Sequence, residues 1–128
     1  MREIKFRAWN PTEKKMWQNI GVCDSLIILE TNNMGLKYMK NQEDATSMQF
    51  TCLLDKNGKE IYEGDIVDCS TKFLKHILEV YWDKRGYQYR LRVNGEMQYD
   101  KTYMIDIAKF GEVIGNIYEH ESLLKGER

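Results

Sequence analysis

The chain has 128 residues, of which 42% are hydrophobic and 30% are charged, with a net charge of −1 and a mean hydropathy of −0.62. These values indicate a soluble globule of about one domain and exclude a disordered chain, a strongly basic arm and an acidic tail. The sequence holds no run of about 20 apolar residues that could span a bilayer. Because its three cysteines (Cys23, Cys52 and Cys69) are odd in number and widely spaced, we expect reduced thiols in a cytoplasmic protein.

Apolar and polar side chains alternate along most of the chain, a pattern typical of strands with one buried face. In the first half, Pro11 and its polar neighbours predict a turn after the first strand, and Asn57-Gly58 predicts a turn after the last. The strands expected in this half lie at residues 3–9, 16–22, 26–30, 36–40 and 48–54.

The second half continues the same alternation, with Asn94-Gly95 as its strongest hairpin signal because a type I′ turn needs two residues at positive φ. After the segment 59–67, we expect strands at 74–82, 87–93, 96–99, 103–107 and 113–118, and one short helix within 119–128. The chain is therefore predicted to be mainly β, a sandwich or barrel with short helices at most. It is expected to form a single domain over residues 1–128, with a soft boundary near residues 41–47 between a small first sheet and a compact barrel.

Three blocks of the sequence resemble the YopX family of small bacteriophage and prophage proteins. The first block is residues 4–10 (IKFRAWN), the second runs from residue 48 to 67 and includes DKNGKEIYEGDIV, and the third is residues 113–119 (VIGNIYE). The resemblance covers essentially the whole chain and implies a phage-encoded cytoplasmic protein with a YopX-like β fold. It implies no reaction, so no catalytic residue is carried over from the family.

Two details follow from this resemblance. Cys52 stands where the family's pattern has glycine, and we expect a regular strand there in place of a bulge. The run Glu63-Gly64-Asp65-Ile66-Val67 resembles the entry to the second strand of SH3-like barrels, in which glycine permits a sharp bend and aspartate bonds nearby amides. The second block is therefore interpreted as a turn and strand signal.

Motifs for catalysis or for a bound cofactor are weak. His76 and His120 are the chain's histidines. Either could meet Cys69 or Cys52 in the fold, but nothing local in the sequence favours a Cys–His catalytic pair. Two histidines and three dispersed cysteines are a poor set of zinc ligands, so no zinc site is predicted. The acidic run from Asp55 to Asp68 raises the question of a calcium loop, but residue twelve of that loop is Ile66 where calcium sites have glutamate. We expect no catalytic residues, no metal and no cofactor.

The uneven distribution of charge is more informative than any motif. Residues 72–111 carry eight basic and five acidic side chains, or +3, whereas residues 19–71 carry four basic and nine acidic ones, or −5. Cations alternate with aromatic rings in one segment, a pattern that suits single-stranded nucleic acid. The candidate contact residues for nucleic acid or a protein partner are Trp82, Lys84, Arg85, Tyr87, Arg90 and Arg92. The alternation also allows a plainer interpretation, in which the tyrosines are core and the arginines are solvated.

Three functional classes remain open at this point. The first is a non-enzymatic binding or regulatory module that contacts a host or phage protein or nucleic acid. The second is a structural or assembly homo-oligomer, in which strand edges are satisfied across a symmetric interface. The third is a small hydrolase that uses the carboxylates around Asp65. The sequence favours the first class, because no catalytic constellation is visible.

Overall fold

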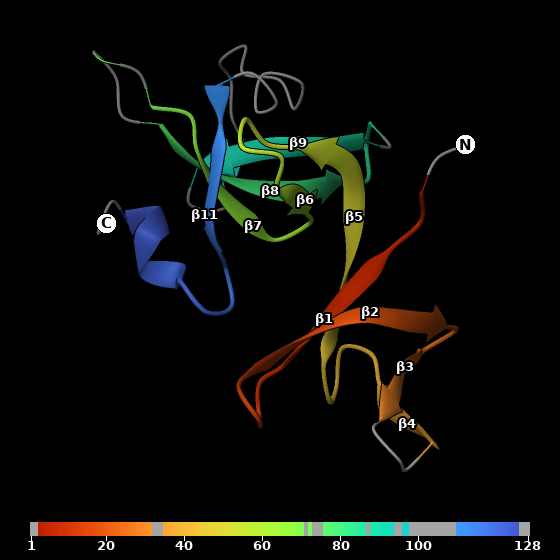
Figure 1. Cartoon of the computed structure of the whole chain (residues 1–128). Helices are drawn as coiled ribbons and strands as arrows, with labels where there is room; N and C mark the ends of the chain where they lie inside the picture. Colours follow the sequence, from red (N-terminus) through yellow and green to blue (C-terminus); the bar gives the residue numbers. More distant parts are fainter. Residues whose placement is uncertain are drawn as a thin grey trace. The chain divides into compact units, whose positions relative to one another are not determined.

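The computed structural model describes residues 3–31, 35–70, 72, 76–86, 88–93, 96–97 and 110–125 and shows a mainly β chain (Figure 1). The chain divides into two compact units, unit 1 (Met1–Phe50) and unit 2 (Thr51–Arg128). The strands of both units pair antiparallel with their neighbours, as the period-two alternation predicts. In the described part of the chain, no helix is long and apolar enough to cross a membrane.

Unit 1 is built mainly from neighbouring strands joined by short turns. Its strand order is β4-β3-β2-β1-β5, and β5 continues into unit 2, where it lies next to β6. The strands are β1 (Phe6–Asn10), β2 (Lys15–Cys23), β3 (Leu26–Thr31), β4 (Gly35–Lys40) and β5 (Thr46–Leu54). Side chains at every second position meet on one face and form the core of this unit, which consists of Ala8, Ile20, Ile27, Leu29, Met39 and Ala45.

Local backbone chemistry explains the turn and the bulge of unit 1. The Asn10 side chain accepts hydrogen bonds from the backbone N–H groups of Thr12 at 3.0 Å and Glu13 at 3.2 Å, which closes the predicted turn. The β1–β2 register then shifts by one residue, and Asn19 takes a left-handed φ of 53° at this bulge. Asparagine tolerates that conformation better than most side chains.

Unit 2 contains a five-stranded sheet in the order β10-β9-β8-β7-β11. The strands of this sheet are β7 (Asp65–Asp68), β8 (Ile77–Asp83), β9 (Gln88–Val93), β10 (Glu96–Met97) and β11 (Glu112–Asn116). Unit 2 also contains β6 (Glu60–Tyr62), which lies next to β5, and the 3₁₀ helix η1 (Glu121–Lys125). Its core consists of Ile61, Val67, Cys69, Leu78, Val80, Leu91 and Val113. The SH3-like barrel stays a prediction, because the described strands leave β10 and β11 at opposite ends of the sheet order.

The second block of the sequence forms the turns that it predicts. Gly58 and Gly64 have φ values of 83° and 86°, which only glycine adopts without strain. Asp65, which is 1% exposed, accepts a hydrogen bond from the Tyr62 backbone N–H at 2.7 Å. This carboxylate therefore holds the bend between β6 and β7 in place.

The prediction of a regular strand at Cys52 is wrong. Cys52 has a φ of 72°, so this position keeps the left-handed backbone that the family's glycine would adopt. The neighbouring Thr51 hydroxyl donates to the Ile61 carbonyl at 2.7 Å and accepts from the Leu53 N–H at 3.3 Å. These two bonds stabilise the irregular backbone, so the local hydrogen bonding outweighs the preference of the cysteine side chain.

Several predicted features lie wholly or partly outside the described part of the chain: Tyr87, the Asn94-Gly95 turn, the strand at 103–107, and one end of each of the segments expected at 74–82, 96–99 and 119–128. The pairing expected across that turn is confirmed where the structure describes it, since Glu96 lies opposite Val93 in the β9–β10 ladder. The units divide at Phe50, within β5, whereas the sequence places a soft boundary near residues 41–47.

Candidate binding site

The predicted contact residues lie on one hairpin, formed by β8 and β9. Asp83 at the end of β8 lies opposite Gln88 at the start of β9, and residues 84–87 connect them. Trp82 is the penultimate residue of β8, and Arg90 and Arg92 lie on β9. The five predicted contact residues that the structure describes thus share one hairpin, but the register places Trp82 on the face of Tyr89 and places Arg90 and Arg92 on the other face. The sixth, Tyr87, lies outside the described residues.

The two faces of this hairpin have different chemistry. Leu78 and Val80 of β8 and Leu91 of β9 are at most 3% exposed and belong to the core of unit 2. The alternate positions place Glu79 opposite Arg92, on the other face of the hairpin. The interpretation that the tyrosines of β9 face the core is confirmed for Tyr89, which packs against the core cluster.

Arg92 is paired with a buried carboxylate. Its Nη2 lies 2.9 Å from Glu79 Oε2, and the Glu79 side chain is only 7% exposed. The Arg92 guanidinium also lies over the Tyr81 ring, 4.4 Å from its centroid. Both contacts hold the guanidinium on the surface of the hairpin and offset its charge.

Arg90 has a similar partner at the end of β8. Its Nη1 lies 3.3 Å from Asp83 Oδ2, and Asp83 Oδ1 accepts the Arg85 backbone N–H at 3.0 Å. The Arg85 N–H bond lowers the pKa of Asp83, and the Arg90 guanidinium adds to this effect against the opposing effect of burial. Both arginines are partly exposed, at 38% for Arg90 and 32% for Arg92, and each is also paired with a carboxylate on its own hairpin.

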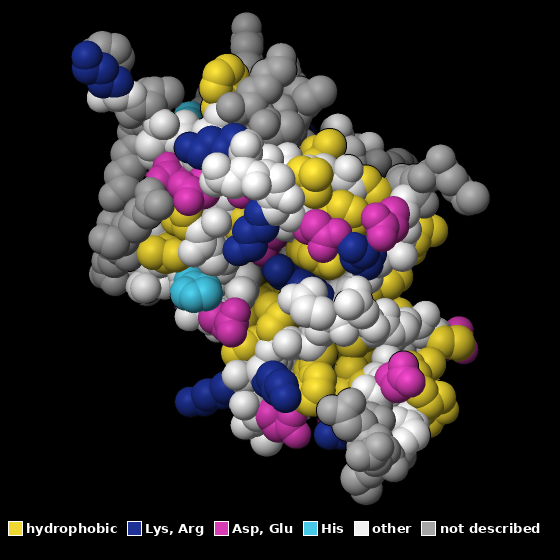
Figure 2. Space-filling model, in the orientation of Figure 1, with side chains coloured by type: hydrophobic (Ala, Val, Ile, Leu, Met, Phe, Trp, Pro, Cys, Tyr) yellow, Lys and Arg dark blue, Asp and Glu magenta, His cyan; other side chains and the backbone are white. Residues whose placement is uncertain are grey.

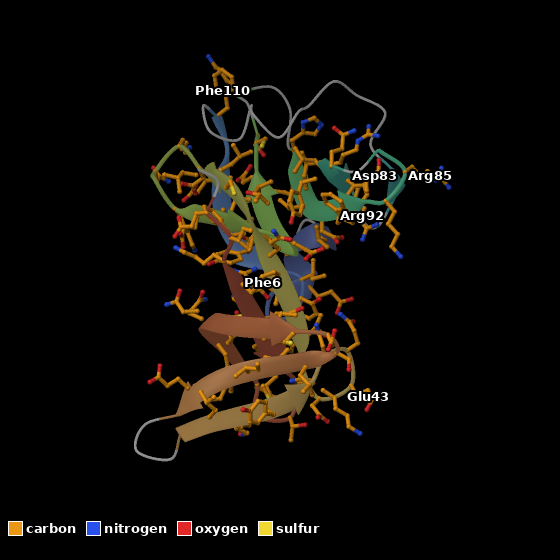
Figure 3. All side chains as sticks on the ribbon, turned by 90° about the vertical axis from the view of Figure 1, so that its right-hand side faces the viewer. Phe6, Glu43, Asp83, Arg85, Arg92 and Phe110 are labelled. Atoms are coloured by element: carbon orange, nitrogen blue, oxygen red, sulfur yellow. The ribbon has the colours of Figure 1, made fainter. Side chains whose placement is uncertain are left out.

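The remaining predicted residues form what we call the hairpin tip: Trp82, Lys84 and Arg85. Trp82 is 40% exposed, and its ring meets the Tyr89 ring edge-on, with centroids 5.0 Å apart and an interplanar angle of 67°. Lys84 and Arg85 are both exposed in the turn. Figure 3 shows Asp83 and Arg85 near one another at this end of the hairpin. The tip therefore presents two cations beside a supported aromatic ring.

The carboxylate of Asp55, considered above for a calcium loop, is committed to backbone bonds. Its Oδ1 accepts the N–H groups of Asn57 and Lys59, each at 2.9 Å, and its Oδ2 accepts that of Val113 at 2.9 Å. Burial alone would raise the pKa of Asp55, but these three N–H bonds and the Lys59 charge together lower it. Asp55 thus stabilises its turn and joins that turn to β11.

The two histidines and Cys69, considered above for catalysis or zinc binding, also lie in unit 2. The backbone N–H of Cys69 donates to the His76 carbonyl at 2.8 Å, so these two residues are neighbours. His120 Nδ1 accepts the Asn116 N–H at 3.2 Å in the turn after β11. Within the described residues, no three His, Cys, Asp or Glu side chains form a group that could hold a metal ion.

Comparison with known proteins agrees with the resemblance found in the sequence. The family model described as YopX protein matches residues 5–125. The chain is also similar to the solved structure titled "Crystal structure of protein EF1440 from Enterococcus faecalis", with 26% identity and a TM-score of 0.67 over 97% of this chain and 99% of that chain. No curated protein matches the sequence.

Proposed function

The chain belongs to the YopX family, and from this premise we propose that it is a phage- or prophage-encoded binding module, without catalytic activity, that acts in the cytoplasm of the bacterial host. The hairpin tip is its contact surface. The observation that carries this proposal is the exposure of Trp82 beside Lys84 and Arg85, on a hairpin whose other cations are already paired. The Tyr89 ring packs edge-on against the Trp82 ring and restricts its orientation, so less ordering is needed on binding.

A non-catalytic role is supported by the way in which the acidic residues are used. Asp55 and Asp65 accept backbone hydrogen bonds and hold turns, and Glu79 and Asp83 hold arginines. A general acid or base must be free to reach a substrate proton, whereas these carboxylates are at most 6% exposed.

Single-stranded nucleic acid is the partner that best matches the chemistry of the hairpin tip. Lys84 and Arg85 suit two neighbouring phosphates, and the exposed Trp82 ring offers a surface on which a base can stack. Because Arg90 and Arg92 are paired with carboxylates, we count two phosphate contacts and not four. For a single strand, two contacts predict a slope of log K against log salt of about −1.4, and four predict about −2.8.

The test is fluorescence anisotropy with a labelled oligothymidylate at several salt concentrations. We expect Lys84→Ala and Arg85→Ala each to reduce the slope by about 0.7, and Trp82→Ala to weaken binding by about 1–3 kcal/mol. Lys56→Ala is the matched control, because Lys56 is an exposed lysine in another turn of the same unit. Equal losses for the control and the tip variants would contradict this site.

A pull-down from host cells, run with and without nuclease, separates the two partner classes. Partners lost after nuclease treatment would support nucleic acid at the hairpin tip. Partners that still co-purify after nuclease treatment, but do not co-purify with Trp82→Ala, would show that the hairpin tip is the contact site and that its ligand is a protein. Capture that is unchanged in Trp82→Ala, Lys84→Ala and Arg85→Ala would refute the proposal.

A further inference from the structure

Strand β4 forms an open edge in unit 1. It stands at the end of the strand order, and within the described residues it is hydrogen-bonded as a strand to β3 alone (Figure 1). The bond from the Asn41 N–H to the Ser25 carbonyl, 2.8 Å long, fixes which backbone groups face β3. Since these groups alternate along an antiparallel strand, the N–H and C=O groups of Leu36, Tyr38 and Lys40 point away from β3.

One of these three outward positions is already closed by the chain itself. The Lys40 N–H donates to Asp44 Oδ2 at 2.9 Å, and the Lys40 carbonyl accepts the Asp44 N–H at 2.9 Å. The turn between β4 and β5 therefore caps the edge at Lys40. Among the residues that the structure describes, the outward backbone groups of β4 that remain available to a partner strand are those of Leu36 and Tyr38, two residues apart.

The side chains at the same two positions are apolar and exposed. Leu36 and Tyr38 are each 57% exposed, and Leu26 beside them on β3 is 39% exposed. The register places Leu36 opposite Glu30 and Tyr38 opposite Ile28, so these side chains share the outer face of the sheet. Figure 2 shows hydrophobic side chains gathered over this part of unit 1.

The charges along the edge favour a self-complementary contact. Lysine normally protects an open strand edge from pairing. Here Lys37 lies on the other face of the strand, and its Nζ is 3.6 Å from Glu13 Oε1, so its charge is offset. Two copies meeting at Lys37 would bring together two lysines and two glutamates, which can pair across the contact as well as within each copy.

We propose that β4 pairs antiparallel with β4 of a second copy, about a two-fold axis at Lys37. Residues opposite each other then have numbers that sum to 74, so Leu36 lies opposite the partner's Tyr38 and Tyr38 opposite the partner's Leu36. This register uses all the available groups, because both pairs are of the hydrogen-bonded kind and together form four bonds. It also packs each exposed leucine against a tyrosine, a favourable cross-strand pair.

The alternative register, centred on Tyr38, fits less well. It would place Leu36 opposite the partner's Lys40, whose backbone groups are already bonded to Asp44. The register at Lys37 avoids this conflict and joins two sheets into one continuous sheet. The contact is confined to one short strand on each copy, so the dimer should be weak and dependent on concentration.

The test is sedimentation velocity of the full chain from about 10 µM to about 1 mM, the range in which small interfaces associate. The average mass should rise from 15.3 kDa toward twice that value. Tyr38→Pro removes an outward N–H that the fold of one copy does not use, so it should leave unfolding unchanged and weaken association about tenfold. Tyr38→Phe is the matched control and should associate like the parent chain.

Two further variants test the interface without proline. Leu36→Asp keeps the backbone donor but places a charge on the apolar pair, and it should also weaken association. Lys37→Thr leaves the two Glu13 carboxylates at the two-fold axis without their lysines, so it should weaken association. A chain that is monomeric throughout, or association that Tyr38→Pro and Leu36→Asp leave unchanged, would overturn the proposal.

Discussion

The left-handed backbone at Cys52 allows a sharp stability prediction, because cysteine stands there with a φ of 72°. A left-handed conformation costs a residue with a Cβ atom about 1–2 kcal/mol, and glycine avoids this cost. Glycine in turn loses about 0.5–1 kcal/mol relative to alanine, because its unfolded chain is more flexible. Glycine at position 52 should therefore be about 0.5–1 kcal/mol more stable than alanine there. Neither variant has a thiol, so the difference in their stability reports the backbone conformation alone.

The matched control is Glu60, which is half-buried in the neighbouring strand β6 and has no left-handed φ. There, Glu60→Gly should be about 0.5–1 kcal/mol less stable than Glu60→Ala. Urea unfolding measures both differences, and 1 kcal/mol corresponds to about 0.5 M in the midpoint for a slope of about 2 kcal/mol/M. If Cys52→Gly is less stable than Cys52→Ala by as much as the control pair, position 52 has an ordinary strand conformation and the reasoning fails.

Three other perturbations test contacts of unit 2. A Cβ atom at Gly115 would lie 2.6 Å from His120 Nδ1 and 2.9 Å from His120 Cβ, so Gly115→Ala should destabilise the chain by about 1–3 kcal/mol. His120→Gly removes both of these atoms and should relieve part of that loss in urea unfolding. Because the pKa of Asp55 is lowered in the folded chain, its carboxylate adds stability that is complete above the ordinary pKa of 3.8 and is lost as pH falls through the folded pKa. Asp55→Asn should therefore lower the free energy of unfolding by about 2 kcal/mol at pH 7. It should also make stability depend less on pH in the acid range. Arg92→Met leaves the Glu79 carboxylate buried without its cation and should lower stability by about 2 kcal/mol in thermal unfolding. Adding Glu79→Leu should restore most of the lost stability. A double variant no more stable than Arg92→Met would contradict this explanation of the pair.

Much of the fold was predictable from the sequence, because a strand with one buried face alternates apolar and polar side chains. The predicted strands at residues 26–30 and 36–40 correspond to β3 and β4, and the short helix expected in the tail is η1. Asp55 and Gly58 mark their turn because their roles are local: the Gly58 N–H donates to the Asp55 carbonyl at 3.0 Å. Features set by residues close in sequence were therefore accessible.

The candidate site was predictable only in part, because its electrostatics depend on register. The sequence marks Arg90 and Arg92 as cations but does not indicate that Glu79 lies opposite Arg92. That pairing follows from the length of the connection between β8 and β9, which has no strong two-residue turn signal to fix it. The available clue was the alternation in β8, which places Glu79 and Asp83 on the face opposite Val80.

The Cys52 error has a different cause. The residue type favoured an extended strand, whereas the hydroxyl of Thr51 bonds a carbonyl ten positions away and supports another conformation. A side-chain bond to a distant backbone group leaves no periodic trace in the sequence. Such positions can be identified only once the neighbouring strands are known.

The pairing of β7 with β11 also has a consequence for how the molecule acquires its structure. Val113 lies opposite Val67, and its N–H reaches back to the Asp55 carboxylate. During synthesis, the hairpins of unit 1 can therefore form from adjacent segments. One edge of β7 can pair early with β8, while its other edge must wait for β11, which is made much later. Nascent chains that stop short of Glu112 should be cleaved readily by protease within unit 2, and those that extend past η1 should resist.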